Sequence, residues 1–151
     1  MLQISKATAY SMQAVLSLVH SYEDDEVIPI TEIATSRDIP ETFLRKLLRS
    51  LINAGVVESK RGYWGGIRLA KPPADITVLE VVEAVEGEVG LSRCVKDPSH
   101  CELGKECPMY IVWREATDLL RNQLEGYTLE QIHHRALALE SQELASSQKS
   151  L

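Results

Sequence analysis

The chain has 151 residues, of which 44% are hydrophobic and 25% are charged, and its formal net charge is -6. This composition excludes a disordered or low-complexity chain and predicts one compact domain with an appendage. Residues 7–20 are uncharged but too short and too polar to span a bilayer, and the N-terminus begins no signal sequence, so we expect a cytoplasmic protein with no membrane partner.

The negative charge is distributed unevenly along the chain. Residues 29–71 hold eight Lys and Arg against four Asp and Glu, whereas residues 1–28 hold one against four and residues 72–151 hold seven against fourteen. A basic middle between acidic flanks is typical of a chain that has one phosphate-binding face and stays soluble through the remainder.

Two helices are predicted before residue 39. Apolar residues at helical spacing predict a first helix from about Lys6 to Tyr22, with Ser5 as its cap. A short second helix, capped by Thr31, is expected to stop near residues 37–38. A tight turn then leads into a third helix.

The third helix is predicted from Ile39–Pro40 to Ala54–Gly55. It carries one broad apolar stripe, formed by Phe43, Leu44, Leu47, Leu48, Leu51 and Ile52. The opposite face carries the basic residues Arg45, Lys46 and Arg49. Two short helices joined by a tight turn, the second basic on its exposed side, predict a helix-turn-helix.

A basic hairpin is predicted directly after the helix-turn-helix. Residues 56–59 and 67–69 are typical of two short strands, and the connection between them contains Lys60, Arg61 and three glycines. Such a hairpin is a wing. With the preceding helices it predicts a winged helix-turn-helix DNA-binding domain over residues 1–75.

A helix and a cysteine-containing loop are predicted for residues 76–107. Thr77 is expected to cap the helix and Gly87 to end it. The only cysteines of the chain then fall within fourteen residues, at Cys94, Cys101 and Cys107. Three thiols cannot all pair as intramolecular disulfides, and the prolines and glycine of this segment indicate a loop. Soft thiolate ligands therefore indicate zinc or iron-sulfur chemistry.

A long helix is predicted from Pro108 to about Leu124, in a region (residues 108–140) that also holds a short tail helix capped by Thr128. Its apolar seam consists of Met109, Val112, Trp113, Ala116, Leu119 and Leu120. A second copy of the helix is the simplest partner, which predicts a homodimer that binds a palindromic operator in double-stranded DNA; packing on the chain's own first helix is the alternative. Residues 141–151 are expected to form a flexible tail.

The expected fold class is thus mainly α with a small β-wing, a winged helix-turn-helix domain plus a long dimerisation helix. No phosphate-binding glycine motif or catalytic triad order is present in the sequence. We therefore expect a protein that is not an enzyme.

Several short motifs occur together in this chain. They are Ile4-Ser5-Lys6 through Tyr10, Ile33-Ala34 with Ile39-Pro40 and Leu44, Leu51 through Val57, Ser59 through Gly62 with Gly65-Gly66, and Val85-Glu86-Gly87. Over residues 1 to about 125 the chain resembles the IscR/NsrR-type family of iron-sulfur-dependent winged-helix transcription regulators. The resemblance implies a bacterial regulator or repressor that senses iron-sulfur status, redox state or nitric oxide, with a 2Fe-2S or 4Fe-4S cluster on the three cysteines.

The same resemblance implies DNA contacts from Thr42, Phe43, Arg45 and Lys46 on the third helix and from Arg61 in the wing. Arg49 and Lys60 lie beside them in the sequence, and such side chains can reach phosphates or base edges. Phe43 is alternatively a core residue, which we favour. Trp64 replaces a residue that is usually small at the wing tip; we favour its packing on a neighbouring helix or the other subunit over a wedge against DNA.

The resemblance leaves the fourth cluster ligand unassigned. Tyr110 stands where one branch of the family has a histidine, and Ala9 where another has a carboxylate donated by the partner's first helix. His100 is the leading candidate for this position. The others are Asp97, Glu102, Glu106 or an exchangeable small ligand.

Two further interpretations stay open. The three cysteines and His100 form a possible structural zinc site, although the CxxC pairs usual in zinc sites are missing. A metal-free thiol switch would pair Cys94 with Cys101 or Cys107 and leave one thiol over.

Overall fold

Helices and one small sheet make up the fold in the computed structural model, which describes residues 3–149 and the side chains of residues 3–142. The main elements are α1 (Lys6–Ser17), α2 (Ile30–Ser36), α3 (Glu41–Asn53), β1 (Val57–Lys60), β2 (Gly66–Leu69), α4 (Val78–Glu86), α5 (Arg93–Lys96), α6 (Pro108–Glu125) and α7 (Leu129–Lys149). Three 3₁₀ turns lie between them, η1 (Pro73–Asp75), η2 (Pro98–His100) and η3 (Gly104–Glu106). The predicted class, mainly α with a small β-wing, is confirmed.

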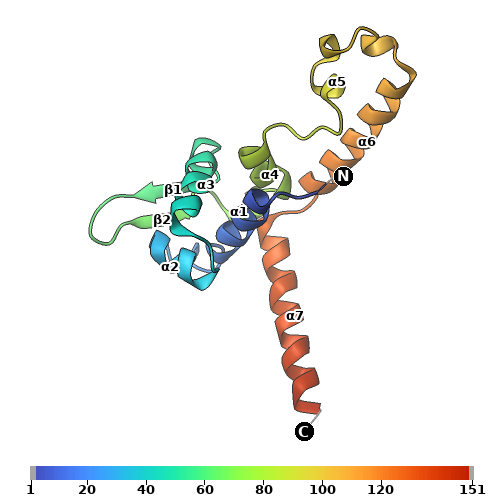
Figure 1. Ribbon diagram of the computed structural model, residues 1–151. Helices are drawn as coiled ribbons and strands as arrows, with labels where there is room; N and C mark the ends of the chain where they lie inside the picture. The colour runs from blue at the N-terminus through green and yellow to red at the C-terminus, as the bar shows by residue number, and fades with distance from the viewer. Residues whose placement is uncertain (1–2, 150–151) are drawn as a thin grey trace.

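The elements form a central body with three projections (Figure 1). The body consists of α1 to α4, and α4 packs on both α1 and α3. The hairpin of β1 and β2 extends from one side, and α5 and α6 with the cysteine loop extend from another. Helix α7 starts at the body, where Leu129 is buried in the core, and then projects away from it. The hairpin and the cysteine loop therefore lie at opposite ends of the molecule.

The body is held together by the apolar faces of its helices. Helix α3 buries four of the six residues in its predicted stripe, namely Leu44, Leu47, Leu48 and Leu51. Each such side chain contributes about 1.5–3 kcal/mol when it leaves water. Phe43 is half-buried and its ring meets the Tyr10 ring edge-on at 6.0 Å between centroids. Ile52 lies at the end of the stripe and is exposed.

The first two helices begin or end at other residues than predicted. Ser5 does cap α1, since its Oγ accepts from the Thr8 N–H at 3.1 Å, but the helix ends at Ser17 and not at Tyr22. Residues 18–25 form tight turns that keep Leu18 buried, so the apolar spacing continues after the helix has stopped. Helix α2 starts at Ile30 after Pro29, so Thr31 lies inside the helix and is not its cap.

The predicted wing is present as an antiparallel pair. Val57 faces Leu69 at its base and Lys60 faces Gly66 at its outer end. The Ile28 segment joins the base, because the backbone N–H groups of Ile28 and Ile67 each donate to the other's carbonyl at 2.9 Å. The hairpin is thus anchored to the body at its base.

The caps predicted beyond the wing are observed. Thr77 and Glu80 form a reciprocal capping box at the start of α4, and Gly87 ends this helix with a φ of +76°. Pro108 opens α6. Thr128 Oγ1 accepts from the Gln131 N–H at 3.3 Å at the start of α7.

Helix α7 is longer than the predicted short tail helix. It continues to Lys149, through most of the segment expected to be a flexible tail; residues 150–151 lie outside the described part of the chain. Residues 129–149 contain no Gly or Pro and are rich in Ala, Leu, Glu and Gln, which favour a helix. No helix among the described residues is long and apolar enough to cross a membrane.

Candidate nucleic-acid interface and cysteine loop

The exposed face of α3 carries the predicted contact residues together. Thr42, Arg45, Lys46 and Arg49 are all exposed, which follows from the burial of the opposite apolar stripe. Arg45 donates to Glu41 one turn earlier, with 2.6 Å between Nη2 and Oε1. Because both side chains are exposed, this pair orients Arg45 more than it stabilises the helix.

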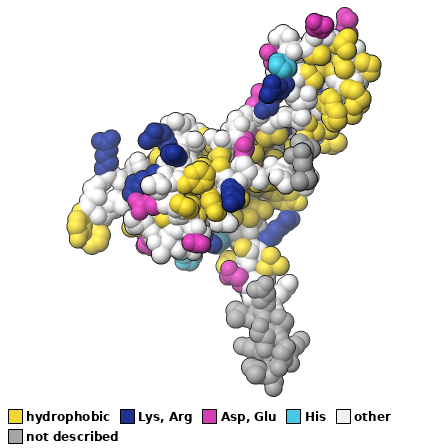
Figure 2. Space-filling model, viewed as in Figure 1, with side chains coloured by type: hydrophobic (Ala, Val, Ile, Leu, Met, Phe, Trp, Pro, Cys, Tyr) yellow, Lys and Arg dark blue, Asp and Glu magenta, His cyan; other side chains and the backbone are white. Residues whose placement is uncertain are grey.

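The wing adds two more cations to the same side of the molecule. Lys60 and Arg61 are exposed, and Lys60 Nζ lies 3.9 Å from an Asp25 carboxylate oxygen. Lys60, Arg61 and Arg45 line a single hollow of about 390 Å³, together with the start of α2. The structure therefore brings the wing cations and one cation of α3 to one surface, and Figure 2 shows Lys and Arg side chains beside the hairpin.

Arg68 is a positioning residue that the sequence did not single out. Its guanidinium forms ion pairs with Glu58 on the facing strand and with Asp25 in the turn after α1. These contacts neutralise two carboxylates at the base of the wing and hold the strands together. Arg68 could have been identified from the expected hairpin register, because it lies directly opposite Glu58, which has the opposite charge.

The wing tip differs from the expectation for Trp64. Its side chain is 87% exposed and its ring meets only that of Tyr63, at 5.0 Å between centroids. Packing of Trp64 on a neighbouring helix of the same chain is therefore wrong. The hairpin that carries this tip projects from the body (Figure 1).

The three cysteines lie on one loop at the other end of the molecule. Cys94 lies in α5, Cys101 follows the 3₁₀ turn at residues 98–100, and Cys107 precedes α6. All three thiols are free; Cys101 is exposed and the other two are half-buried. Among the described residues, no group of three or more Cys, His, Asp or Glu side chains is already gathered to hold a metal ion.

The candidate fourth ligands differ in whether their side chains are free to bind a cluster or already hydrogen-bonded. His100, Glu102 and Glu106 are exposed. Asp97 instead accepts from the Ser99 hydroxyl at 2.6 Å and from the Ser99 N–H at 3.0 Å, and these hydrogen bonds hold the pKa of the Asp97 carboxyl below its usual value. Tyr110, at the position of the family's histidine, is buried.

The base of the cysteine loop is bonded to two helices. The Leu91 N–H donates to the hydroxyl of Thr117 in α6 at 3.1 Å, and Thr117 is 2% exposed. The Val89 N–H donates to Glu83 of α4 at 2.9 Å, and the same carboxylate forms an ion pair with Arg121 of α6. Residues 88–91 are therefore tied to both α4 and α6.

A second polar contact joins α4 to the start of α1. The hydroxyls of Ser5 and Thr8 donate to the Glu86 carboxylate. The Ser5 hydrogen bond and then the Thr8 hydrogen bond lower the pKa of Glu86, against a smaller opposing effect of burial. Helix α4 thus makes specific polar contacts both with α1 and with the base of the loop.

Helix α6 exposes the apolar seam predicted from the sequence. Its exposed members are Met109, Val112, Trp113, Leu119 and Leu120, while Ala116 is half-buried. Ile111 is also exposed and was not predicted, because it falls outside the near-heptad spacing. Figure 2 shows hydrophobic side chains gathered along the projection that contains α6.

Comparison with known proteins identifies relatives of this chain by sequence. The sequence model of the Rrf2 family, described as iron-dependent transcriptional regulators, matches residues 4–135. The HTH-type transcriptional regulator NsrR of Bacillus licheniformis is 32% identical over 132 residues, which cover 87% of this chain and 92% of that protein. The regulator IscR of Photorhabdus laumondii is 30% identical over 132 residues, covering 87% and 79% respectively.

A solved structure agrees with these sequence matches. CymR, the global cysteine regulator of B. subtilis, superposes with a TM-score of 0.71 at 26% identity, covering 89% of this chain and 98% of that one. The relatives are named as transcriptional regulators, a role that is not enzymatic, in agreement with the absence of catalytic motifs. The chain therefore belongs to the Rrf2 family of winged-helix transcriptional regulators.

Proposed function

We propose that this regulator binds a palindromic operator as a homodimer and that an iron-sulfur cluster on Cys94, Cys101 and Cys107 controls its DNA affinity. One observation carries the proposal: three free thiols share a loop whose base is hydrogen-bonded to α4 and α6. Helix α4 also packs on α1 and α3. A rearrangement of the loop can therefore reach the DNA-reading helix through one packed element.

The donor set fits an iron-sulfur cluster, because cysteine thiolates are the usual ligands of such clusters. When bound, the cluster would supply a centre that responds to redox state, nitric oxide or iron supply. The thiols are not gathered in advance, so residues 93–107 must rearrange to hold it. This segment consists of short turns with mostly exposed side chains, which makes such a rearrangement feasible.

His100 is the preferred fourth ligand from this chain. Its imidazole is exposed and adjoins Cys101, and it forms no hydrogen bond among the described side chains. Asp97 is already engaged with Ser99, and Tyr110 is buried against the body of the projection. Glu102 and Glu106 are the alternatives within the loop.

DNA docking follows from the two basic elements. Thr42, Arg45, Lys46 and Arg49 would enter the major groove with α3, while Lys60 and Arg61 of the wing would contact the adjacent backbone or minor groove. Two copies of α3 in a symmetric dimer would meet half-sites about 34–36 Å apart along the duplex.

The exposed seam of α6 supports the homodimer. Five large apolar side chains on one helix are costly to leave in water, and a second copy of the same helix would cover them. The seam adjoins the cysteine loop, because α6 begins directly after Cys107. Occupation of the loop could therefore also influence how the two subunits pack.

Anaerobic purification tests the cofactor. We expect a coloured protein that contains iron and acid-labile sulfide, and we expect Cys94→Ala, Cys101→Ala and Cys107→Ala each to lose both while staying folded. Ser99→Ala is a matched control in the same loop and should retain the cluster. A colourless protein with stoichiometric zinc would instead support a site formed by the cysteines and His100, and a metal-free protein with a reversible disulfide would support a thiol switch.

A further inference from the structure

The tip of the wing exposes two aromatic rings. Tyr63 is 93% exposed and Trp64 is 87% exposed, which makes them the most exposed large hydrophobic side chains in the described part of the chain. Their rings meet at a near-right angle of 86°. Because each ring can bury roughly 150–250 Å² on contact, a pair held in water at the end of a projection indicates a binding surface.

A hydrogen-bonded turn presents the two rings. Tyr63 and Trp64 are its central residues, and the Gly65 N–H closes it by donating to the Gly62 carbonyl at 3.0 Å. Gly62 has a φ of +120°, which other residues rarely adopt, and a Cβ on Gly65 would lie 2.6 Å from the Lys60 carbonyl oxygen. The turn therefore needs these glycines, and it leaves both rings exposed to solvent.

The electrostatic surroundings of the rings suit a polyanion. Lys60 and Arg61 precede the turn, and residues 59–67 contain no Asp or Glu. The nearest carboxylates at the base of the hairpin, those of Asp25 and Glu58, are paired with Arg68. Lys60 also lies 3.9 Å from Asp25, whereas Arg61 forms no ion pair within the described residues. An apolar tip beside an unpaired cation fits the wall of a DNA groove better than it fits a neutral protein surface.

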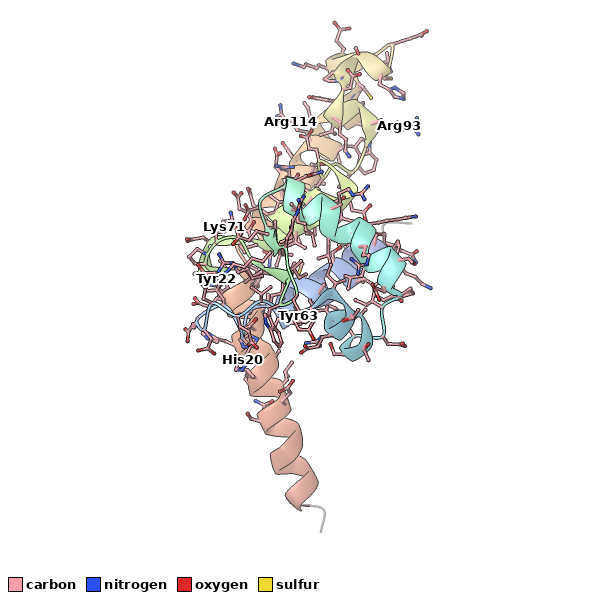
Figure 3. The ribbon with its side chains drawn as sticks, turned by 90° about the vertical axis from the view of Figure 1, so that its left-hand side faces the viewer. His20, Tyr22, Tyr63, Lys71, Arg93 and Arg114 are labelled. Atoms are coloured by element: carbon pink, nitrogen blue, oxygen red, sulfur yellow. The ribbon has the colours of Figure 1, made fainter. Side chains whose placement is uncertain are left out.

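The position of the wing separates this surface from the dimer seam. Tyr63 lies toward the viewer in Figure 3, whereas Arg93 and Arg114 mark the cysteine loop and α6 at the upper end. Within one subunit, the wing and α6 thus lie at different ends (Figure 1). On the other hand, the wing shares one hollow with Arg45 of α3, so it lies on the side that would meet DNA.

We propose that Tyr63 and Trp64 form an apolar wedge that enters the DNA minor groove beside Arg61 and partly unstacks one base step. The inference rests on the DNA docking proposed above and adds a site of recognition outside the footprint of α3. Pyrimidine–purine steps such as TA and CA unstack most easily. The wing would therefore prefer operators with such a step under its tip and would bend the duplex there.

Fluorine NMR follows the wedge directly. The chain has two tryptophans, so fluorotryptophan labelling gives two resonances, and Trp64→Phe assigns them. The probe is a duplex enriched from a random pool by the full-length wild-type protein. On binding, we expect the Trp64 resonance to shift and to lose its solvent isotope effect. A shift of the Trp113 resonance alone would instead report a change at the α6 seam.

Affinity measurements complete the test. We expect Trp64→Ala and Tyr63→Ala each to weaken binding by about tenfold with little change in salt dependence, and Trp64→Phe to keep most of the affinity. Replacing a TA step under the tip by AA should weaken the wild type but not Trp64→Ala.

Three results would overturn the wedge. If the wild type binds the duplex while Trp64 stays open to solvent, only the wedge is wrong. A Trp64 shift that grows with protein concentration in the absence of DNA would assign the tip to a protein contact. Failure of the wild type to enrich any duplex would contradict the proposed DNA docking itself.

Discussion

The basic side chains of the DNA face differ in how they are held. Arg45 is paired with Glu41, and Lys60 lies near Asp25, whereas Arg61 forms no ion pair within the described residues. A cation without a protein partner can contact a phosphate without first breaking a salt bridge. Arg61 should therefore contribute to binding chiefly through its charge.

Arg61→Ala tests that assignment. We expect weaker DNA binding at every duplex sequence, and a plot of log affinity against log salt that is less steep by about 0.9 for each subunit bound. Titrations at several salt concentrations measure the slope. Arg114→Ala removes the same charge from an exposed position in α6 and should leave the slope unchanged; equal slopes for wild type and Arg61→Ala would remove the wing from the interface.

Glu86 makes the contact between α1 and α4 depend on pH. Its pKa is lowered in the folded chain by the hydroxyls of Ser5 and Thr8. A carboxylate with a lowered pKa stabilises the fold above its unfolded pKa, near 4.5, and this contribution is lost as the pH falls through the folded value.

Glu86→Gln should therefore reduce the free energy of unfolding at pH values above 4.5, with a difference from wild type that shrinks at lower pH. Denaturant titrations across this range measure the difference. Glu88→Gln, at an exposed glutamate without a side-chain hydrogen bond in the described structure, should show little effect. A Glu86→Gln difference that does not change with pH would contradict the role of the ionised carboxylate.

The residues of the candidate sites were easier to predict from the sequence than their arrangement in space. The cysteines, the cations of α3 and the wing, and the seam of α6 could all be named from composition and spacing. The arrangement of the thiols could not, because it depends on the backbone path of a loop without regular spacing. The same limit applies to Arg68, whose partners Glu58 and Asp25 come together only when the hairpin folds onto the turn after α1.

At the level of elements, strong local signals predicted the structure best. The amphipathic stripe of α3, the glycines of the wing, the caps Ser5 and Thr77, and Pro108 at the first position of α6 all lie where expected. The end of α1 and the length of α7 were missed. Apolar residues continue past Ser17 as a buried turn, and no Gly or Pro ends α7. Periodicity therefore reports burial more reliably than it reports where a helix stops.

One hydrogen bond, from the Leu91 N–H to Thr117, joins the base of the cysteine loop to α6, and a single substitution can remove it. Thr117→Val keeps the volume of a buried side chain but removes the acceptor for the Leu91 N–H. We expect a loss of about 1–3 kcal/mol in the free energy of unfolding and faster hydrogen exchange at Leu91.

Thr117→Ser retains the hydroxyl and serves as the control for this contact. Its Leu91 amide should stay protected. If both variants exchange at the wild-type rate at Leu91, the hydrogen bond does not anchor the base of the loop.

At the scale of the whole molecule, the wing and the cysteine loop lie at opposite ends. If the loop controls DNA binding, a structural element must connect the two. Helix α4 is the described element that contacts α1, α3 and α6, and it holds the loop base through Glu83. The α6 seam would join two such molecules. The dimer could not be derived from the fold of one chain, but the exposed apolar face makes it testable.

Leu119→Glu should break the proposed dimer. Leu119 is 71% exposed and lies in the seam, so a glutamate there would place a charge in the subunit contact and raise the dimer dissociation constant by roughly a hundredfold. Sedimentation equilibrium measures this constant. Leu139→Glu alters an exposed leucine of α7 outside the seam and should leave the dimer intact; dissociation by both variants, or by neither, would contradict the assigned seam.

The central claim is that the cysteine loop controls DNA affinity. Its most direct test measures binding of one anaerobic sample to the enriched duplex, before and after nitric oxide bleaches the visible absorption. We expect affinity to change by at least about tenfold as the absorption is lost, which corresponds to a coupling free energy within the usual range. Cys94→Ala, Cys101→Ala and Cys107→Ala should show no such change. Equal affinities of the wild type before and after bleaching would contradict the claim.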